Sequence, residues 1–294
     1  MTPQNARQVP YRGRLAPSPT GFLHLGHART FWTAQQRALA NNGVLVLRNE
    51  DLDHQRCRKE FVSAMFEDLA WFGFRWQEGP DVGGPLGPYS QSERRDFYRA
   101  AFNQLQARGC VYPCSCSRQD VLRALQAPHH GEDEPIYPGT CRPNAARGQS
   151  VESGAAPHAS GNASPLINWR FRVPDREIIA FTDNHFGSLS FVAGKDFGDF
   201  ILWRHDDVPS YQLAVVVDDA AMQITEVVRG EDLLKSTARQ LLLYRALGWA
   251  PPSFYHCSLV TDENGRRLAK RHDSLSLRTL RANRADPAKL RELW

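Results

Sequence analysis

The sequence predicts an α/β fold in which a parallel sheet, covered by helices, is split by one small inserted domain. Strand-like and helix-like segments alternate between residues 12 and 74, which is typical of βαβ units. Residues 44–47, VLVL, are continuously apolar, as expected of a strand buried on both faces. Residues 109–165 break the alternation, because cysteines cluster there and a long part is rich in Ala, Ser, Gly and Pro.

Local signals divide the first half of the chain into elements. RGRLAP, residues 12–17, predicts a short strand that ends at its proline. A helix is expected from residue 26 to about 39, and the NNG of residues 41–43 is a good helix stop. After the strand at 44–47, residues 61–74 space their apolar side chains as a helix does.

The second half returns to the α/β pattern after several short β-type segments. INWRFRV, IIAFTD and SLSFV, all within residues 167–192, predict a sheet in the insert. ITEVVRGEDLL, residues 224–234, predicts a strand that leads into a helix ending near residue 249. We therefore expect four parts: a first half of the large domain at 11–108, the insert at 109–190 with a flexible stretch near 143–165, a second half at 191–275, and a C-terminal tail at 276–294.

Composition is that of a globular protein. The 294 residues carry a formal net charge of +4, which permits a nucleic-acid partner without requiring one. No segment approaches the roughly 20 apolar residues of a membrane span, and the N-terminal residues lack the apolar core of a secretion signal. We expect a cytoplasmic protein with no membrane partner, and a monomer because no heptad pattern is visible.

The stretch RLAPSPTGFLHLGHARTFW, residues 14–32, combines a tight turn with the start of a helix. Helix N-termini bind anions well, because free backbone N–H groups and the helix dipole both favour negative charge. His24 and His27 lie one helical turn apart, and Gly26 lets a ligand approach the backbone. These features predict a nucleotide-phosphate site, although a loop with two solvated imidazoles explains the same spacing.

A basic segment lies near the other end of the chain. ENGRRLAKRHDS, residues 263–274, follows a glycine-containing turn and carries Lys270 among several arginines. Lys270 suits a phosphate group, but an ordinary solvated run of charges explains the segment equally well.

Six cysteines are too few for a disulfide scaffold in a chain of this length. Cys114, Cys116 and Cys141 cluster in YPCSCSR and YPGTCR, and thiolates in such a cluster favour Zn²⁺. A fourth ligand must come from elsewhere, and the intervening His129 and His130 are chemically suitable. The scattered cysteines are expected to be ordinary thiols: Cys57, Cys110 and Cys257.

Together these motifs resemble the class I aminoacyl-tRNA synthetases, and in particular their glutamyl branch. HLGH at 24–27 stands where that class has HIGH, and RLAKR at 267–271 stands where it has KMSKS. Further blocks are similar to the glutamyl-type catalytic domain and follow in the same order: RLAPSPTG, RNEDLD, YQLAVVVDD and VVRGEDLL. The resemblance extends from Arg12 to about Ser274 and implies ATP-dependent activation of an amino acid on a Rossmann-like domain.

The resemblance assigns roles around ATP. His24, Gly26 and His27 would contact the nucleotide, with the two imidazoles at its phosphates. Lys270 and Arg267 would supply positive charge to the phosphates as the transition state forms, and Mg²⁺ is expected with ATP. Arg267 and Ala269 depart from the family pattern, which has Lys and Ser there, so a modestly slower activation step is expected.

The resemblance also implies a pocket for L-glutamate. Arg14 and Arg229 would bind its carboxylates, because a guanidinium matches a carboxylate. Glu50 would accept its ammonium group, and Tyr211 offers a phenol at the same site. The backbone of three consecutive residues would line the pocket: Ala16, Pro17 and Ser18.

Ordinary structural roles explain the same residues one at a time. Glu50 could cap a surface turn, and Tyr211 could belong to the core. Arg229 could pair with Glu226 or Glu231.

Two features resemble the short paralogues of glutamyl-tRNA synthetase, which transfer glutamate to the queuosine base in the anticodon of tRNA(Asp). The insert contains cysteines, and only 24 residues follow Lys270 (294 minus 270), so no anticodon-binding domain is expected. In those paralogues a tyrosine four residues before the last cysteine completes a structural zinc site. Tyr137 stands there, which implies one Zn²⁺ with four ligands: Cys114, Cys116, Tyr137 and Cys141.

Three alternatives remain at this point. A truncated glutamyl-tRNA synthetase would charge a tRNA acceptor end. A non-catalytic paralogue would only bind tRNA or nucleotide, for which Arg267 and Ala269 are the sole support. A zinc-containing nucleic-acid module would leave most of the chain unexplained and should be more basic than +4.

Overall fold

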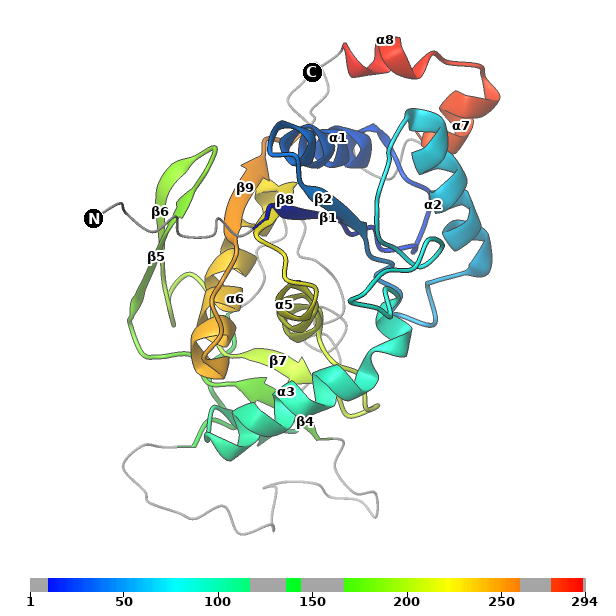
Figure 1. Cartoon of the computed structure of the whole chain (residues 1–294). Coiled ribbons are helices and arrows are strands. Elements are labelled where there is room, and N and C mark those ends of the chain that lie inside the picture. The colour runs from blue at the N-terminus through cyan, green and yellow to red at the C-terminus, as the bar shows by residue number, and fades with distance from the viewer. Residues whose placement is uncertain (1–9, 117–135, 144–166, 260–275, 293–294) are drawn as a thin grey trace, which may run out of the picture.

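The computed structural model describes residues 10–116, 136–143, 167–259 and 276–292. Five residues singled out above lie outside the described residues: His129, His130, Arg267, Ala269 and Lys270. Nearly all of the stretch 143–165 lies outside them as well. In the described part, helices and strands surround the helix α5 (Tyr211–Ala221), which lies at the centre of Figure 1. None of the described helices combines the length and the apolar character that crossing a bilayer requires.

The first half forms the expected strand–helix–strand–helix unit. β1 (Arg12–Leu15) and β2 (Val44–Leu47) pair in parallel, with α1 (Leu25–Ala40) between them in sequence and α2 (Lys59–Phe72) following. Gly73 ends α2 in the left-handed conformation, with φ of 98°, which glycine adopts at little cost. Figure 1 shows α1 lying across β1, β2 and β8. These element predictions are confirmed.

The last strands continue this arrangement from the far end of the sequence. β8 (Glu226–Gly230) leads through the short 3₁₀ turn η2 (Glu231–Leu233) into α6 (Leu234–Leu247), and β9 (Ser253–Cys257) pairs with β8 in parallel. The backbone N–H of Thr225 donates to Arg12 at 2.9 Å, which places the start of β8 beside the start of β1. The two parallel strand pairs therefore lie next to each other.

The strands expected in the insert are present, but the sheets are mixed, which corrects the expectation of a purely parallel sheet in the large domain. β3 (Val111–Cys114), β4 (Asn168–Phe171) and β7 (Phe200–Trp203) form an antiparallel sheet next to α3 (Arg95–Ala107). β5 (Ile178–Asp183) and β6 (Gly187–Val192) form a hairpin, but β5 also pairs in parallel with β9. Two strands that lie before the expected boundary at residue 190 therefore pair with strands after it: β4 with β7, and β5 with β9. An edge strand is free to pair with any extended segment that packing brings beside it, which local sequence does not reveal.

The described C-terminal residues form two short helices that pack on the first half. α7 (Leu277–Ala282) contacts α2, and α8 (Pro287–Arg291) follows it. Arg291 donates to the carbonyl of Phe72 at 2.8 Å, and its guanidinium lies 4.6 Å from the centre of the Trp32 ring. The tail thus packs on the C-terminal end of α2 and on the middle of α1.

Asp68 of α2 is buried at this contact. Within the described residues, neither of its carboxylate oxygens has a hydrogen-bond partner, and Arg281 of α7 lies 3.5 Å away. Burial raises the pKa of Asp68 to about 6, and the positive charges of Arg281 and Arg278 oppose that shift only in part.

Replacing Asp68 with Asn is expected to stabilise the protein at pH 8 but not at pH 4. The folded-state pKa lies above that of an unfolded aspartate, so the ionised form destabilises the fold as pH rises through 6. Urea unfolding should show a gain on the order of 1 kcal/mol at pH 8 that disappears in acid. Glu67→Gln, which alters the exposed partner of Arg281, is the control; a gain that did not depend on pH would contradict this assignment.

Candidate active site

His24 and His27 form the N-terminal cap of α1. The Nδ1 atom of His24 accepts the backbone N–H of Gly26 at 3.1 Å, and Nδ1 of His27 accepts that of His24 at 3.2 Å. Because each Nδ1 is an acceptor, each neutral ring carries its proton on Nε2. The two ring centres lie 3.8 Å apart, so both Nε2–H donors belong to neighbouring rings at the start of α1. The arrangement can bind an anion.

Gly26 is required by this cap. A Cβ atom there would lie 2.9 Å from Cε1 of His24, closer than such atoms approach. The structure therefore gives Gly26 a role in seating the His24 ring, in addition to the ligand access expected from the sequence.

The segment 260–275, which contains the KMSKS-like motif, is flanked by residues that lie at the site. On one side, the N–H of Leu259 donates to Oε1 of Glu231 at 2.8 Å, just after β8. On the other side, Ser276 forms a β-bridge with His24, and the N–H of Leu277 donates to Leu23 at 2.7 Å. Both ends of the segment are thus tied to elements that carry site residues.

The residues expected to bind glutamate come together where the parallel strands end. Arg14 lies near the end of β1, Glu50 follows β2, Arg229 lies near the end of β8, and Tyr211 begins α5; all four are buried. Nη1 of Arg14 donates to the carbonyl of Val228 at 2.6 Å and joins β1 to β8. Ligands of α/β sheets commonly bind at this carboxyl edge.

Electrostatic influence confirms that these side chains are neighbours. Burial raises the pKa of Tyr211, while the charges of Arg229, Glu50 and Arg14 also act on its phenol. The backbone N–H of Glu50 donates to the carbonyl of Pro17 at 3.0 Å, so the loop of Ala16–Ser18 lies beside it.

The ordinary alternatives for Glu50 and Arg229 are wrong. Glu50 is buried and accepts hydrogen bonds from Arg48 at 2.9 and 3.2 Å, so it does not cap a surface turn. Arg229 pairs with neither Glu226 nor Glu231; its Nε and Nη2 donate to His256 and Thr237 at 3.1 and 2.7 Å.

Two buried guanidinium donors at these strand ends make no hydrogen bond in the described part of the chain, although Nε of Arg14 lies 3.6 Å from Oδ1 of Asp219 in an ion pair. Within the described residues, Nε of Arg14 and Nη1 of Arg229 have no hydrogen-bond partner, although both atoms are inaccessible to solvent. A buried N–H of a guanidinium normally has an acceptor, because leaving it unpaired costs free energy. Carboxylate oxygens are the acceptors that guanidinium groups prefer.

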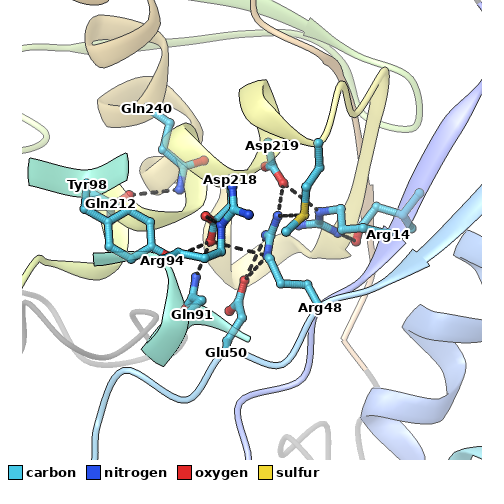
Figure 2. Close-up of polar contacts among 12 residues, drawn as sticks. Arg14, Arg48, Glu50, Gln91, Arg94, Tyr98, Gln212, Asp218, Asp219 and Gln240 are labelled. Carbon is cyan, nitrogen blue, oxygen red and sulfur yellow. Dashed lines mark hydrogen bonds and ion pairs between the residues drawn. The ribbon is translucent and has the colours of Figure 1, made fainter. Parts of the chain in front are cut away.

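A buried network of charges supports the pocket and was missed in the sequence. Arg48 is fully buried and donates to Asp219 at 2.6 Å as well as to Glu50 (Figure 2). Asp218 accepts hydrogen bonds from Arg94, Gln91 and Tyr98, at 2.6, 2.8 and 3.0 Å. Two aspartates directly after the apolar run AVVV were the available signal, since acidic side chains in such a helix need buried partners.

The three clustered cysteines and Tyr137 form a separate group. The three Sγ atoms lie within 4.8 Å of one another, and the phenol oxygen of Tyr137 lies 3.4 and 3.3 Å from Sγ of Cys114 and Cys116. Tetrahedral zinc with Zn–S bonds of about 2.3 Å needs ligand atoms about 3.7 Å apart, which these spacings approach. Cys114, Cys116 and Cys141 can therefore hold a metal, with Tyr137 placed as a fourth ligand.

Arg170 of β4 borders this group. Its Nε donates to Sγ of Cys114 at 3.2 Å, and its guanidinium lies 3.7 Å from the centre of the Tyr137 ring. The guanidinium of Arg170 therefore lies against both a thiol and the phenol of this group.

The fold and the site define a class of protein. Parallel βα halves, a histidine-capped helix start and a group of buried charged residues at the strand ends are the parts of a class I aminoacyl-tRNA synthetase catalytic domain. The family model described as tRNA synthetases class I (E and Q), catalytic domain, matches residues 10–291, and the chain belongs to that family. It is a ligase of the class I aminoacyl-tRNA synthetases.

Two similar proteins carry a more specific name than the family model does. The chain is 49% identical over 276 residues to a glutamyl-Q tRNA(Asp) synthetase from Symbiobacterium thermophilum, covering 94% of this chain and 82% of that protein. It is 46% identical to a protein of the same name from Nitratidesulfovibrio vulgaris, covering 92% of this chain and 81% of that protein.

A solved structure has the same fold. The glutamate tRNA ligase from Elizabethkingia meningosepticum, in complex with its amino acid, aligns with a TM-score of 0.74 at 31% identity. The alignment covers 90% of this chain and 53% of that one, so the chain spans about half the length of that ligase.

Proposed function

We propose that this protein activates L-glutamate with ATP to form glutamyl-adenylate and transfers the glutamate to the queuosine base in the anticodon of tRNA(Asp). The first half of this proposal is supported by the buried guanidinium of Arg229, whose Nη1 makes no hydrogen bond within the described residues, and by the buried Arg14 beside it at the strand ends, because guanidinium groups suit the carboxylates of a small ligand. The second half is supported by two relatives named glutamyl-Q tRNA(Asp) synthetase, each aligned over about four-fifths of its length. A tRNA substrate places the reaction in the cytoplasm.

In the proposed activation step the protein positions glutamate and ATP and stabilises the negative charge that develops between them. Arg14 and Arg229 hold the carboxylates of glutamate, Glu50 accepts its ammonium group, and Tyr211 adds a phenol; the backbone of Ala16, Pro17 and Ser18 lines the pocket. One carboxylate oxygen attacks the α-phosphate of ATP, and pyrophosphate leaves. Holding the two reactants in line supplies much of the rate enhancement.

The nucleotide is held at the start of α1. His24 and His27 donate their Nε2–H groups to phosphate oxygens, on the helix whose N-terminus Gly26 helps to form. Lys270 and Arg267 neutralise charge on the leaving pyrophosphate, and Mg²⁺ accompanies ATP. No side chain acts as a covalent nucleophile.

Transfer of radiolabelled glutamate tests the proposal directly. The acceptors are tRNA(Asp) with queuosine, tRNA(Asp) without it, and tRNA(Glu). Label found only on queuosine-bearing tRNA(Asp) supports the proposal. Glutamate-dependent pyrophosphate exchange without label on any tRNA would support activation alone and refute the acceptor.

Charging of tRNA(Glu) is the second candidate. The chain is 44% identical to glutamate–tRNA ligase 2 from Nitrosococcus oceani over 91% of its own length, but over only 55% of that protein. Label on tRNA(Glu) in the same assay would select this function.

We also propose that the metal of the cysteine cluster is one structural Zn²⁺, held by Cys114, Cys116, Cys141 and Tyr137. When bound, Zn²⁺ links the end of β3 to residues 137–141, which lie outside the described helices and strands.

Loss of this metal is expected to loosen the cluster before the rest of the fold. Elemental analysis should find one zinc per chain, and Cys116→Ser should lose most of it. Hydrogen exchange of the backbone amides of residues 111–116 and 137–142 should then accelerate about tenfold or more, because local opening needs only the free energy of that part. Cys110→Ser changes a cysteine outside the cluster and should keep both the zinc and the slow exchange. Purified protein without stoichiometric zinc would contradict the assignment of a zinc site to this cluster.

A further inference from the structure

Two buried residues that the proposed reaction does not use lie behind Arg229. His256 lies in β9 directly opposite Arg229 of β8, and Asp183 ends β5 on the other side of β9. Both side chains are fully buried. Nδ1 of His256 lies 2.7 Å from Oδ2 of Asp183, and Nε of Arg229 donates to Nε2 of His256 at 3.1 Å.

The hydrogen bonds fix the state of each group. The carboxylate of Asp183 accepts the backbone N–H groups of His185, Phe186 and His256, at 3.0, 2.9 and 3.1 Å. These bonds hold the carboxylate in one orientation, so Nδ1 of His256 must carry the proton that it donates. Nε2 is then a lone-pair acceptor, which is what the N–H of Arg229 requires.

The same environment keeps the imidazole neutral. Burial lowers the pKa of His256 to about 4, with help from the charge of Arg229, while Asp183 opposes the shift. Burial alone would raise the pKa of Asp183, but hydrogen bonds from His256 and from the backbone lower it to about 2. Near neutral pH the pair is therefore a carboxylate and an uncharged ring.

Arg229 and Arg48 differ in whether a carboxylate of the protein neutralises their charge. Arg48 contacts carboxylates directly, and they neutralise its charge. Among the described residues, Arg229 forms no ion pair; its hydrogen-bond acceptors are a neutral imidazole and the hydroxyl of Thr237. The positive charge of Arg229 is thus available to a ligand. Its Nη1 atom has no hydrogen-bond acceptor within the described residues.

We infer that Asp183 and His256 are positioning residues that hold Arg229 for the side-chain carboxylate of glutamate, which glutamine lacks, and so make the site select glutamate over glutamine. The inference rests on the proposed function. A carboxylate completes both the charge and the hydrogen bonding of Arg229. An amide satisfies neither, and its own NH₂ group would face another donor.

Two substitutions at His256 test its hydrogen bond to Asp183 and its hydrogen bond from Arg229 separately. His256→Gln places an amide oxygen where Nε2 can accept from Arg229, whereas His256→Asn keeps a donor for Asp183 and leaves Arg229 without its acceptor. Asp183→Asn presents an N–H to Nδ1 and so favours the wrong tautomer, with a proton on Nε2.

The readout is glutamate-dependent pyrophosphate exchange, with glutamine as a competing inhibitor. His256→Asn and Asp183→Asn should raise the KM for glutamate about tenfold or more, with less effect on glutamine inhibition and on the KM for ATP. His256→Gln should recover most of the selectivity. Unchanged selectivity in both variants, or parallel losses for glutamate, glutamine and ATP, would overturn the inference.

A measurement on the unaltered protein removes dependence on the folding of variants. Nitrogen-15 NMR of the histidine rings should show His256 as a neutral Nδ1–H tautomer at pH 6. An Nε2–H tautomer or an imidazolium at that pH refutes the arrangement. Absence of glutamate-dependent exchange in the unaltered protein refutes the proposed function and this inference together, whereas normal exchange with unselective variants refutes the inference alone.

Discussion

Replacing Arg48 with Met is expected to destabilise the protein by about 3–5 kcal/mol, since removal of one partner leaves buried charges uncompensated. Arg48 is the only residue in Figure 2 that contacts both Glu50 and Asp219, and it lies 3.7 Å from Asp218. Methionine fills similar space but offers no donors. Glutamate binding should fall as well, because Glu50 loses the contacts that orient it.

Urea unfolding measures the first effect, and exchange kinetics measure the second. Arg56→Met is the matched control: Arg56 is exposed, so its loss should change stability by less than about 0.5 kcal/mol. Adding Asp219→Asn to Arg48→Met should recover part of the loss, because the orphaned carboxylate is removed. A loss below about 1 kcal/mol for Arg48→Met would mean that the network contributes little to stability.

Replacing Lys270 with Ala is expected to slow glutamate activation about 100-fold, as removal of one transition-state donor commonly does. The charge on the leaving pyrophosphate exists mainly in the transition state, so the loss should appear in kcat. Glutamate does not contact this charge, and its KM should remain close to that of the unaltered enzyme.

Single-turnover formation of glutamyl-adenylate isolates this step from tRNA transfer. Lys289→Ala, an exposed lysine of α8, is the control and should leave the rate unchanged. Equal losses in glutamate affinity and in turnover would assign Lys270 to ground-state binding.

Local signals in the sequence were sufficient for the elements that form the site. The turn and glycine before α1, the apolar run of β2 and the NNG stop each act within a few residues, so β1, α1 and β2 were predicted where they lie. Arg14, Glu50, Tyr211 and Arg229 were proposed through a resemblance, and the structure brings them together. Their roles in binding stay a prediction.

What escaped prediction depends on pairing across long separations. β5 and β9 are each unremarkable short strands, and nothing within either indicates that Asp183 lies opposite Phe254. The partners of Arg229 were therefore sought among nearby acids, whereas the actual partners come from β9 and α6. Arg94 and Asp218, 124 positions apart, were missed for the same reason.

The pairing of β5 with β9 also has a consequence during synthesis. Arg14, Asp183 and Arg229 all leave the ribosome before residues 253–257, which complete the sheet. Contacts between residues close in sequence can form while translation continues, because closing a short loop costs little conformational entropy. The cap of α1 can form early in the nascent chain, but the support of the amino-acid pocket must await β9. A nascent chain thus acquires the histidine cap of its phosphate site early and the support of its glutamate site only with β9, and Arg267 and Lys270 leave the ribosome after both.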